Sequence, residues 1–193
     1  MSISASEYSD LVITITSSYD AVLFDRGTGA TRYAGFWNPK SQGLLRPLGS
    51  VGVESYDDIN GNRRPYPDLG RAKEPVSFWR PVPPKGYISL GDIAHKGWNE
   101  PDVYRIWCLR DDLAVRGSHA PRRFWDTSKS KAKEMSVWEV QPILHSSRVT
   151  GQDSSSKIAF ALGNFCNVEG YSPPDASLAN VVVLPVESLI NTK

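Results

Sequence analysis

Short apolar runs, each bounded by turn-forming residues, dominate the hydrophobic pattern of this chain. Lys157–Leu162 and Asn180–Leu184 are compact apolar stretches, Asp10–Thr16 is β-branched, and Val103–Leu109 mixes aromatic with β-branched residues. Runs of this length between clusters of Gly, Pro, Asn and Ser predict strands. The 15 glycines and 14 prolines are spread along the chain and divide it into short elements. The pattern therefore predicts an all-β protein.

One arrangement of polar and apolar positions occurs three times. Each copy has Asp-X-Gly or Asp-X-Ser, then Trp, then Leu-Gly, and then an aromatic residue, with Asp-to-Trp spacings of 12, 11 and 12. A repeat indicates a fold assembled from similar units. The repeated positions, which we assign to the scaffold, are Asp25, Asp68 and Asp126; Trp37, Trp79 and Trp138; and Gly49, Gly91 and Gly163.

The repeat also predicts local structure within each unit. Asp-X-Gly/Ser favours a tight turn at the tip of a hairpin, so each Trp is expected in the returning strand and to pack in the core. Leu-Gly is typical of a strand that ends or bulges where another backbone approaches closely. Residues Ser128–Val140 fit a helix by themselves, but the repeat favours a strand there.

Three such units predict a pseudo-threefold β-prism, with a β-sandwich as the alternative. The 193 residues suit a single domain over 1–193, with repeats at approximately 20–64, 65–121 and 122–193. The third copy holds an insertion at His145–Lys157, rich in Ser and Gly, which we expect to be a surface loop.

Composition argues against nucleic acid as a partner, against a disulfide framework and against a membrane-spanning helix. The formal net charge of +1 gives no global field that would select nucleic acid. Cys108 and Cys166 form no disulfide framework, and a bridge between them stays open. The N-terminus does not read as a signal peptide, and no apolar run approaches the ~20 residues of a membrane-spanning helix. We expect a soluble, cytoplasmic protein, with export by a signal-free route as the alternative.

The candidate chemistry points away from catalysis. His95, His119 and His145 lack metal-ligand spacing, and there is no nucleophile elbow of the Gly-X-Ser-X-Gly type. Arg80–Pro84 fits a polyproline ligand or, more simply, a rigid corner. We therefore predict no enzyme, no catalytic residue, no metal and no cofactor.

The segment Phe78–Ala94 carries a family resemblance. Its Trp-Arg-Pro, Gly-Tyr and Leu-Gly-Asp series resembles the hallmark of the vacuolar protein sorting-associated protein sixty-two family, and is similar to the adaptor-binding repeats of bridge-like lipid-transfer proteins. The likeness covers most of residues 20–185 and continues through Cys108–Leu113, Ser136–Glu139, Gly163–Phe165 and Gly170–Pro173. It implies a module that recognises proteins and membranes, with no catalytic residues to carry over. Related-looking domains also accompany pore-forming or insecticidal proteins.

Candidate binding residues come from loops and from uneven charge. The aromatic residue that ends each repeat (Tyr56, Trp98 and Tyr171) falls in a loop, where exposure is expected. Residues 105–133 hold eight Lys and Arg against three Asp, and basic clusters attract anionic headgroups. A solvated face is the simpler explanation of this stretch. We select Arg116, Arg122 and Arg123 for anionic groups.

These choices predict a non-catalytic recognition module. Its expected partner is a membrane lipid or glycan, reached through inter-strand loops. The alternatives are a toxin or defence protein, such as the targeting subunit of a pore former, and an adaptor for proline-containing peptides. The oligomeric state and the exact ligand stay open at this point.

Overall fold

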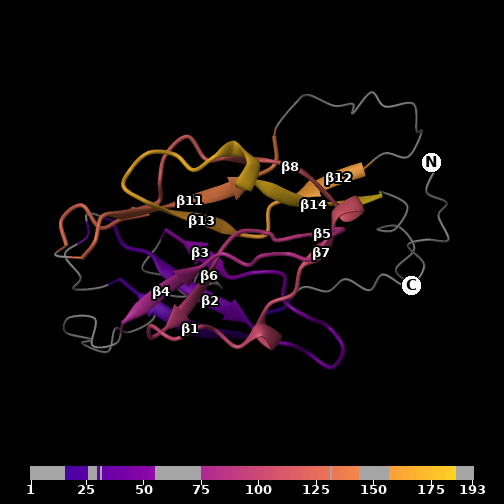
Figure 1. The fold of residues 1–193 in the computed structure, drawn as a ribbon, viewed down its shortest axis with the longest axis horizontal. Coiled ribbons are helices and arrows are strands. Elements are labelled where there is room, and N and C mark those ends of the chain that lie inside the picture. Colours follow the sequence, from indigo (N-terminus) through magenta and orange to yellow (C-terminus); the bar gives the residue numbers. More distant parts are fainter. Residues whose placement is uncertain are drawn as a thin grey trace.

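The computed structural model describes residues 16–25, 30, 32–54, 75–130, 132–143 and 157–185. This part of the chain is all-β, as predicted: it contains strands and short 3₁₀ helices but no α-helix (Figure 1). The strands are β1 (Tyr19–Phe24), β2 (Gly35–Pro39), β3 (Val51–Val53), β4 (Val76–Trp79), β5 (Tyr87–Ile88), β6 (Ile93–Lys96), β7 (Leu109–Arg110), β8 (Ala114–Arg116), β9 (Ser118–His119), β10 (Trp125–Asp126), β11 (Met135–Gln141), β12 (Lys157–Phe160), β13 (Phe165–Glu169) and β14 (Asn180–Pro185). The 3₁₀ helices are η2 (Val103–Arg105), η3 (Asp111–Leu113) and η4 (Ala176–Leu178).

The strands form several small antiparallel sheets. Their orders are β1-β2-β3, β10-β11-β13 with β9 beside β11, β12-β14-β8, β4-β6 and β5-β7. The predicted strands at 157–162 and 180–184 are confirmed as β12 and β14. Ser128–Val140 gives the strand β11, and Trp138 pairs with Cys166 across β13.

The prediction of a strand over Val103–Leu109 is wrong for most of its length. The Asp102 carboxylate accepts a hydrogen bond from the Tyr104 backbone N–H at 2.9 Å, and this cap starts the 3₁₀ turn η2. Only Leu109 enters a strand, β7. A local side-chain cap thus prevails over the strand propensity of the apolar residues. The first predicted strand, Asp10–Thr16, lies outside the described residues except for Thr16, which is not in a strand.

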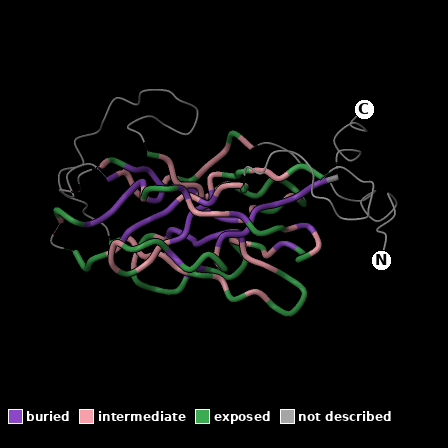
Figure 2. The backbone as a smooth tube through the Cα atoms, turned by 90° about the horizontal axis from the view of Figure 1, so that it is seen from above, coloured by how far each residue is buried: buried purple, intermediate pink, exposed green. Residues whose placement is uncertain are grey.

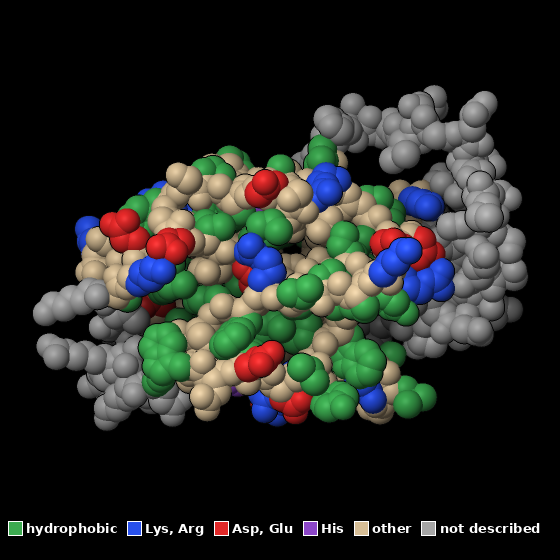
Figure 3. All heavy atoms as spheres, viewed as in Figure 1, with side chains coloured by type: hydrophobic (Ala, Val, Ile, Leu, Met, Phe, Trp, Pro, Cys, Tyr) green, Lys and Arg blue, Asp and Glu red, His purple; other side chains and the backbone are tan. Residues whose placement is uncertain are grey.

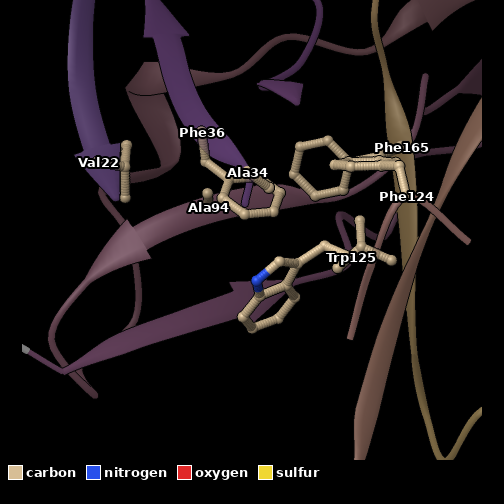
Figure 4. Close-up of a cluster of buried hydrophobic side chains, with 8 residues drawn as sticks. Val22, Ala34, Phe36, Ala94, Phe124, Trp125 and Phe165 are labelled. Atoms are coloured by element: carbon tan, nitrogen blue, oxygen red, sulfur yellow. The ribbon is translucent and has the colours of Figure 1, made fainter. Parts of the chain in front are cut away.

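The residue that precedes each repeated Trp lies in or against the central core: Phe36 and Val137 are buried in it, and Phe78 packs against it. Phe36, Phe165 and Trp125 lie together in Figure 4. The Phe36 ring lies 5.0 Å from Phe78 and 5.1 Å from Phe165, both edge to face, which is a favoured aromatic geometry. Buried segments run through the middle of the molecule, with exposed loops around them (Figure 2).

The repeated Trp residues pack outside this cluster, because successive strand residues point to opposite faces of a sheet. Trp37 and Trp138 are buried and Trp79 is half-buried. The Trp79 indole donates to Ser77 Oγ at 2.7 Å, and the Trp138 indole donates to Ser136 Oγ at 3.0 Å. Core packing, as predicted for the Trp set, is therefore observed for Trp37 and Trp138. The central cluster itself contains the preceding residues instead of the Trp.

The three Leu-Gly elements approach one another closely, as their glycines predicted. A Cβ added at Gly49 would lie 2.8 Å from Leu90 O, one at Gly91 would lie 2.5 Å from Phe165 O, and one at Gly163 would lie 2.8 Å from Val51 Cγ1. Each glycine precedes its strand by two residues, rather than ending or bulging one. The neighbour is a backbone atom at Gly49 and Gly91 and the Val51 side chain at Gly163, so the missing Cβ allows close packing of neighbouring units at all three positions.

The residue after each Leu-Gly is polar and buried, and it bonds to the next unit. Ser50 Oγ accepts from Ala94 N at 3.0 Å, Asp92 Oδ2 accepts from Asn167 N at 2.6 Å, and Asn164 Nδ2 donates to Ser50 O at 3.4 Å. The second and third units also share a serine hydrogen bond: the Ser77 hydroxyl donates to Gly97 O, and the Ser136 hydroxyl donates to Gly170 O.

The β-prism arrangement itself is not confirmed. The described sheets contain two, three or four strands, and none closes on itself. The Asp68 position and the loop predicted at His145–Lys157 lie outside the described residues, apart from Lys157, which begins β12. The single domain and its repeat boundaries stay predictions.

Candidate recognition surface

Several large apolar side chains are exposed on connecting segments. Leu44 is 94% exposed, Tyr104 is 77% exposed and Trp98 is 73% exposed. Val103 and Trp107 are also exposed. Clustered exposure of this kind marks binding sites, whereas apolar residues scattered singly need no explanation.

A tight turn in the β2–β3 connection presents Leu44. Gln42 and Leu45 exchange backbone hydrogen bonds of 3.2 and 2.9 Å across it, and Gly43 holds a φ of 58°. Glycine adopts this left-handed conformation without the steric cost of a side chain. Leu44 is consequently held at the tip of the loop, away from the core.

The segment around η2 lies against the β2–β3 connection. The Trp107 N–H donates to Pro47 O at 3.1 Å, and the Arg46 guanidinium carbon lies 5.6 Å from the centre of the Trp107 ring. Arg46 also donates to Gly43 O at 2.6 Å, which ties it to the turn. We call the set Leu44, Arg46, Val103, Tyr104 and Trp107 the loop surface. Figure 3 shows hydrophobic side chains along the lower edge of the molecule, where Figure 1 places the β2–β3 connection and η2.

The three aromatic residues selected from the sequence are not brought together in the described structure. Trp98 lies after β6, early in the segment that leads to the loop surface. Tyr171 is half-buried after β13, with the Arg123 guanidinium carbon 5.2 Å from its ring centre. Tyr56 lies outside the described residues.

The three selected arginines all have partners within the chain. Arg116 donates to the carbonyl oxygens of Ala176 and Ser177. Arg122 pairs with Glu54 at 3.0 Å, and Arg123 pairs with Asp126 at 2.7 Å. Two more cations of the basic stretch are paired: Arg110 with Asp112 and Lys133 with Glu169. Local carboxylates thus offset much of the positive charge that the sequence places in residues 105–133.

Arg122, Arg123 and Tyr171 do meet, together with two residues that sequence reasoning missed. Arg32 Nη1 lies 3.4 Å from Glu54 Oε1 and donates to Arg123 O at 3.0 Å. We call Arg32, Glu54, Arg122, Arg123 and Tyr171 the arginine cluster. Nothing in the sequence near Arg32 marks it, because its neighbours in the cluster are distant along the chain.

The members of the loop surface were missed for a different reason. The strand predicted over Val103–Leu109 includes Trp107 and implies that alternate residues are buried, and Leu44 lies in none of the repeated motifs. An available signal was the apolar pair Leu44-Leu45 directly after Gly43 in a polar connection.

The described residues offer little for acid–base or metal chemistry. No group of three or more His, Cys, Asp or Glu among them is arranged to hold a metal ion. Burial raises the pKa of the Cys166 thiol to about 12, so it stays protonated and unreactive at neutral pH. Cys108 and Cys166 are both free, which answers the question of a bridge. Within the described ranges, no helix is long and apolar enough to cross a bilayer.

Comparisons with known proteins agree with this picture of the fold. The family model described as "Vacuolar protein sorting-associated protein 62" matches residues 36–184. None of the curated proteins matches the chain. Among solved structures, the chain is similar to GNIP1Aa from Chromobacterium piscinae, with a TM-score of 0.56 and 19% identity over 84% of this chain. The match covers 33% of GNIP1Aa, so this chain spans about a third of its length. At that identity the likeness shows the fold alone.

Proposed function

We propose that this chain, which belongs to the vacuolar protein sorting-associated protein 62 family, is a non-catalytic recognition module that docks on a membrane surface. The observation that carries the proposal is the loop surface. Its apolar side chains stand in solvent on two connections that the Trp107–Pro47 hydrogen bond holds together.

The chemistry of the loop surface suits the boundary between lipid and water. Trp and Tyr concentrate at the headgroup level of membranes, because each combines an apolar ring with a polar tip. Leu44 precedes Arg46 in the same turn, so the leucine would enter the acyl region while the guanidinium stays among the headgroups. Burying one such apolar side chain contributes about 1.5–3 kcal/mol.

Charge contributes little to the proposed contact. The two connections hold three cations (Lys40, Arg46 and Arg105) against two carboxylates (Glu100 and Asp102), and Lys40 is paired with Asp20 at 2.9 Å. Four of the eight cations in residues 105–133 (Arg110, Arg122, Arg123 and Lys133) pair with carboxylates. We therefore assign the affinity to apolar contact, and a membrane without anionic lipid is a sufficient partner.

Co-sedimentation with phosphatidylcholine vesicles tests the proposal. The intact chain should bind, and the double variant Leu44→Ser, Tyr104→Ser should lose affinity at least tenfold, because two buried side chains contribute roughly 3 kcal/mol together. The control is Val82→Ser, which removes an equally exposed apolar side chain (93%) outside the loop surface and should bind normally.

Two results would contradict membrane docking. The first is an intact chain that stays in the supernatant at millimolar lipid. The second is a double variant that binds as the intact chain does. Since these vesicles carry neither sugar nor protein, binding to them also separates lipid recognition from glycan recognition and from an adaptor role.

A further inference from the structure

Two guanidinium groups in the arginine cluster converge on one carboxylate. Arg122 donates to Glu54 Oε1 at 3.1 Å and lies 3.0 Å from Oε2 through its second terminal nitrogen. Arg32 reaches Oε1 from the other side at 3.4 Å. Arg32, Arg122 and their shared acceptor Glu54 come from three separate segments of the chain, so the fold, not local sequence, brings them together.

The surroundings hold Arg32 in position. Arg32 donates to Arg123 O at 3.0 Å, and Arg123 in turn is fixed by Asp126 at 2.7 Å and by contact with the Tyr171 ring. Asp126 is almost fully buried, and two donors from Ser128 and Arg123 hold its oxygens. One side of the cluster is thereby preorganised, which reduces the entropic cost of binding a ligand.

Glu54 can move away from Arg32 and Arg122 at little cost in stability. Its side chain is 36% exposed and stands directly after the last residue of β3. Ion pairs at this degree of exposure contribute little to stability, because solvent screens them and ordering two long side chains costs entropy. Removing the glutamate would leave Arg32 and Arg122 facing one another without a carboxylate between them.

We propose that Arg32 and Arg122 form a binding site for a tetrahedral oxyanion, a phosphate or sulfate group, and that Glu54 occupies this site from within the chain. Such an anion offers more acceptor oxygens than a carboxylate and carries up to two charges. Arginine is the side chain best shaped for bidentate contact with it.

Titration of the full chain with inorganic phosphate, followed by the side-chain NMR signals of the arginines, tests the site. Glu54→Gln should tighten phosphate binding about 3–10-fold, since it removes the competing carboxylate. The matched control is Glu169→Gln. It makes the same charge change at an exposed glutamate that pairs with Lys133, and it should change affinity less than twofold. Arg122→Ala should weaken binding at least fivefold while leaving the circular dichroism spectrum unchanged, because its side chain is mostly exposed.

Equal tightening by Glu54→Gln and Glu169→Gln would overturn the site, since it would show a general charge effect. An unaltered affinity in Arg122→Ala would overturn it as well. Phosphatidylcholine vesicles with and without a phosphoinositide then identify the source. Preferential binding of Glu54→Gln to the phosphoinositide vesicles assigns a lipid headgroup, and binding to free phosphate alone assigns a soluble ligand. The variant Leu44→Ser, Tyr104→Ser should keep its phosphate affinity, so this inference stands or falls independently of membrane docking.

Discussion

At the scale of single residues, equivalent repeat positions have acquired opposite electrostatic environments. Burial raises the pKa of Asp25 from its ordinary value of 3.8 to about 6, and the Trp125 indole donor offsets only part of this effect. Burial also acts on Asp126, but donors from Ser128 and Arg123 outweigh it and lower its pKa. Asp25 directly follows β1 and Asp126 ends β10, the first strands of two equivalent hairpins. The repeat therefore fixes their place, while their neighbours set their charge.

This contrast predicts that Asp25→Asn stabilises the protein at neutral pH. A carboxyl whose pKa is raised by folding favours the fold when protonated, so its contribution to stability is lost as pH rises through about 6. The amide cannot ionise and still offers an oxygen to the Trp125 indole. We expect the free energy of unfolding at pH 7.5 to rise by about 1–2 kcal/mol, after allowance for solvent screening. The difference should vanish at pH 4, as measured by urea unfolding.

Asp126→Asn is the control, and its effect should have the opposite sign. A lowered pKa means that the ionised form supports the fold, so this variant should lose stability at pH 7.5. The loss should persist down to about pH 4 and shrink only as pH falls below the ordinary pKa of 3.8. If both variants shift stability in the same direction at pH 7.5, the environments inferred for these two carboxyls are wrong.

At the scale of elements, the close approach at Leu-Gly is the feature that binds neighbouring units. Gly91 holds a φ of 85°, and a Cβ there would lie 2.5 Å from Phe165 O. Gly86 holds nearly the same φ, 83°, with no atom within 4 Å of its hypothetical Cβ. Substitutions at Gly91 and Gly86 therefore distinguish the free-energy cost of a side chain at positive φ from the cost of its contact with Phe165 O.

We predict that Gly91→Ala destabilises the protein by about 2–5 kcal/mol and that Gly86→Ala does so by only about 1–2 kcal/mol. Both substitutions place a side chain at positive φ, which costs roughly 1–2 kcal/mol. Gly91→Ala also forces two backbones apart, and overpacking of this kind costs roughly 1–3 kcal/mol more. Chemical denaturation of the two variants measures the difference. Equal losses would show that the contact with Phe165 is not rigid.

The elements also show how far sequence reasoning reached. The sequence pattern predicted the all-β class, the strands at 157–160 and 180–184, and the close contacts at the Leu-Gly glycines. These features depend on residues that are near one another in the sequence, such as alternating apolar positions, turn residues and glycines without a Cβ. The strand predicted over Val103–Leu109 is wrong because the Asp102 carboxylate caps a 3₁₀ turn at its start. The sequence predicted three members of the arginine cluster, Arg122, Arg123 and Tyr171. It did not predict Arg32 and Glu54, because only the tertiary structure brings them to the other three.

At the scale of the whole molecule, polar residues connect the repeat units. Arg80 directly follows β4. It donates two hydrogen bonds of 2.8 Å to the Asp92 carboxylate and a third to Asn167 O in β13. Asp92 is buried, so the guanidinium compensates a charge that would otherwise be costly inside the protein. Cations on the surface are paired as well: Arg122 and Lys133 pair with carboxylates from other segments, and Arg123 pairs with Asp126 three residues along the chain. The molecule consequently presents apolar loops to its surroundings more readily than free positive charge.

This distribution of charge predicts that docking on vesicles depends only weakly on salt. Each unpaired basic residue near an anionic membrane contributes roughly 1 kcal/mol, and raising the salt from 50 to 500 mM shortens the screening length about threefold. A polybasic contact would therefore lose affinity more than tenfold over that range. Contact through the loop surface should change less than threefold and should be similar on phosphatidylcholine vesicles with and without phosphatidylserine. Co-sedimentation across the salt series decides between the two. A steep loss would show that the cations of residues 105–133 leave their carboxylates at the membrane and carry the binding themselves.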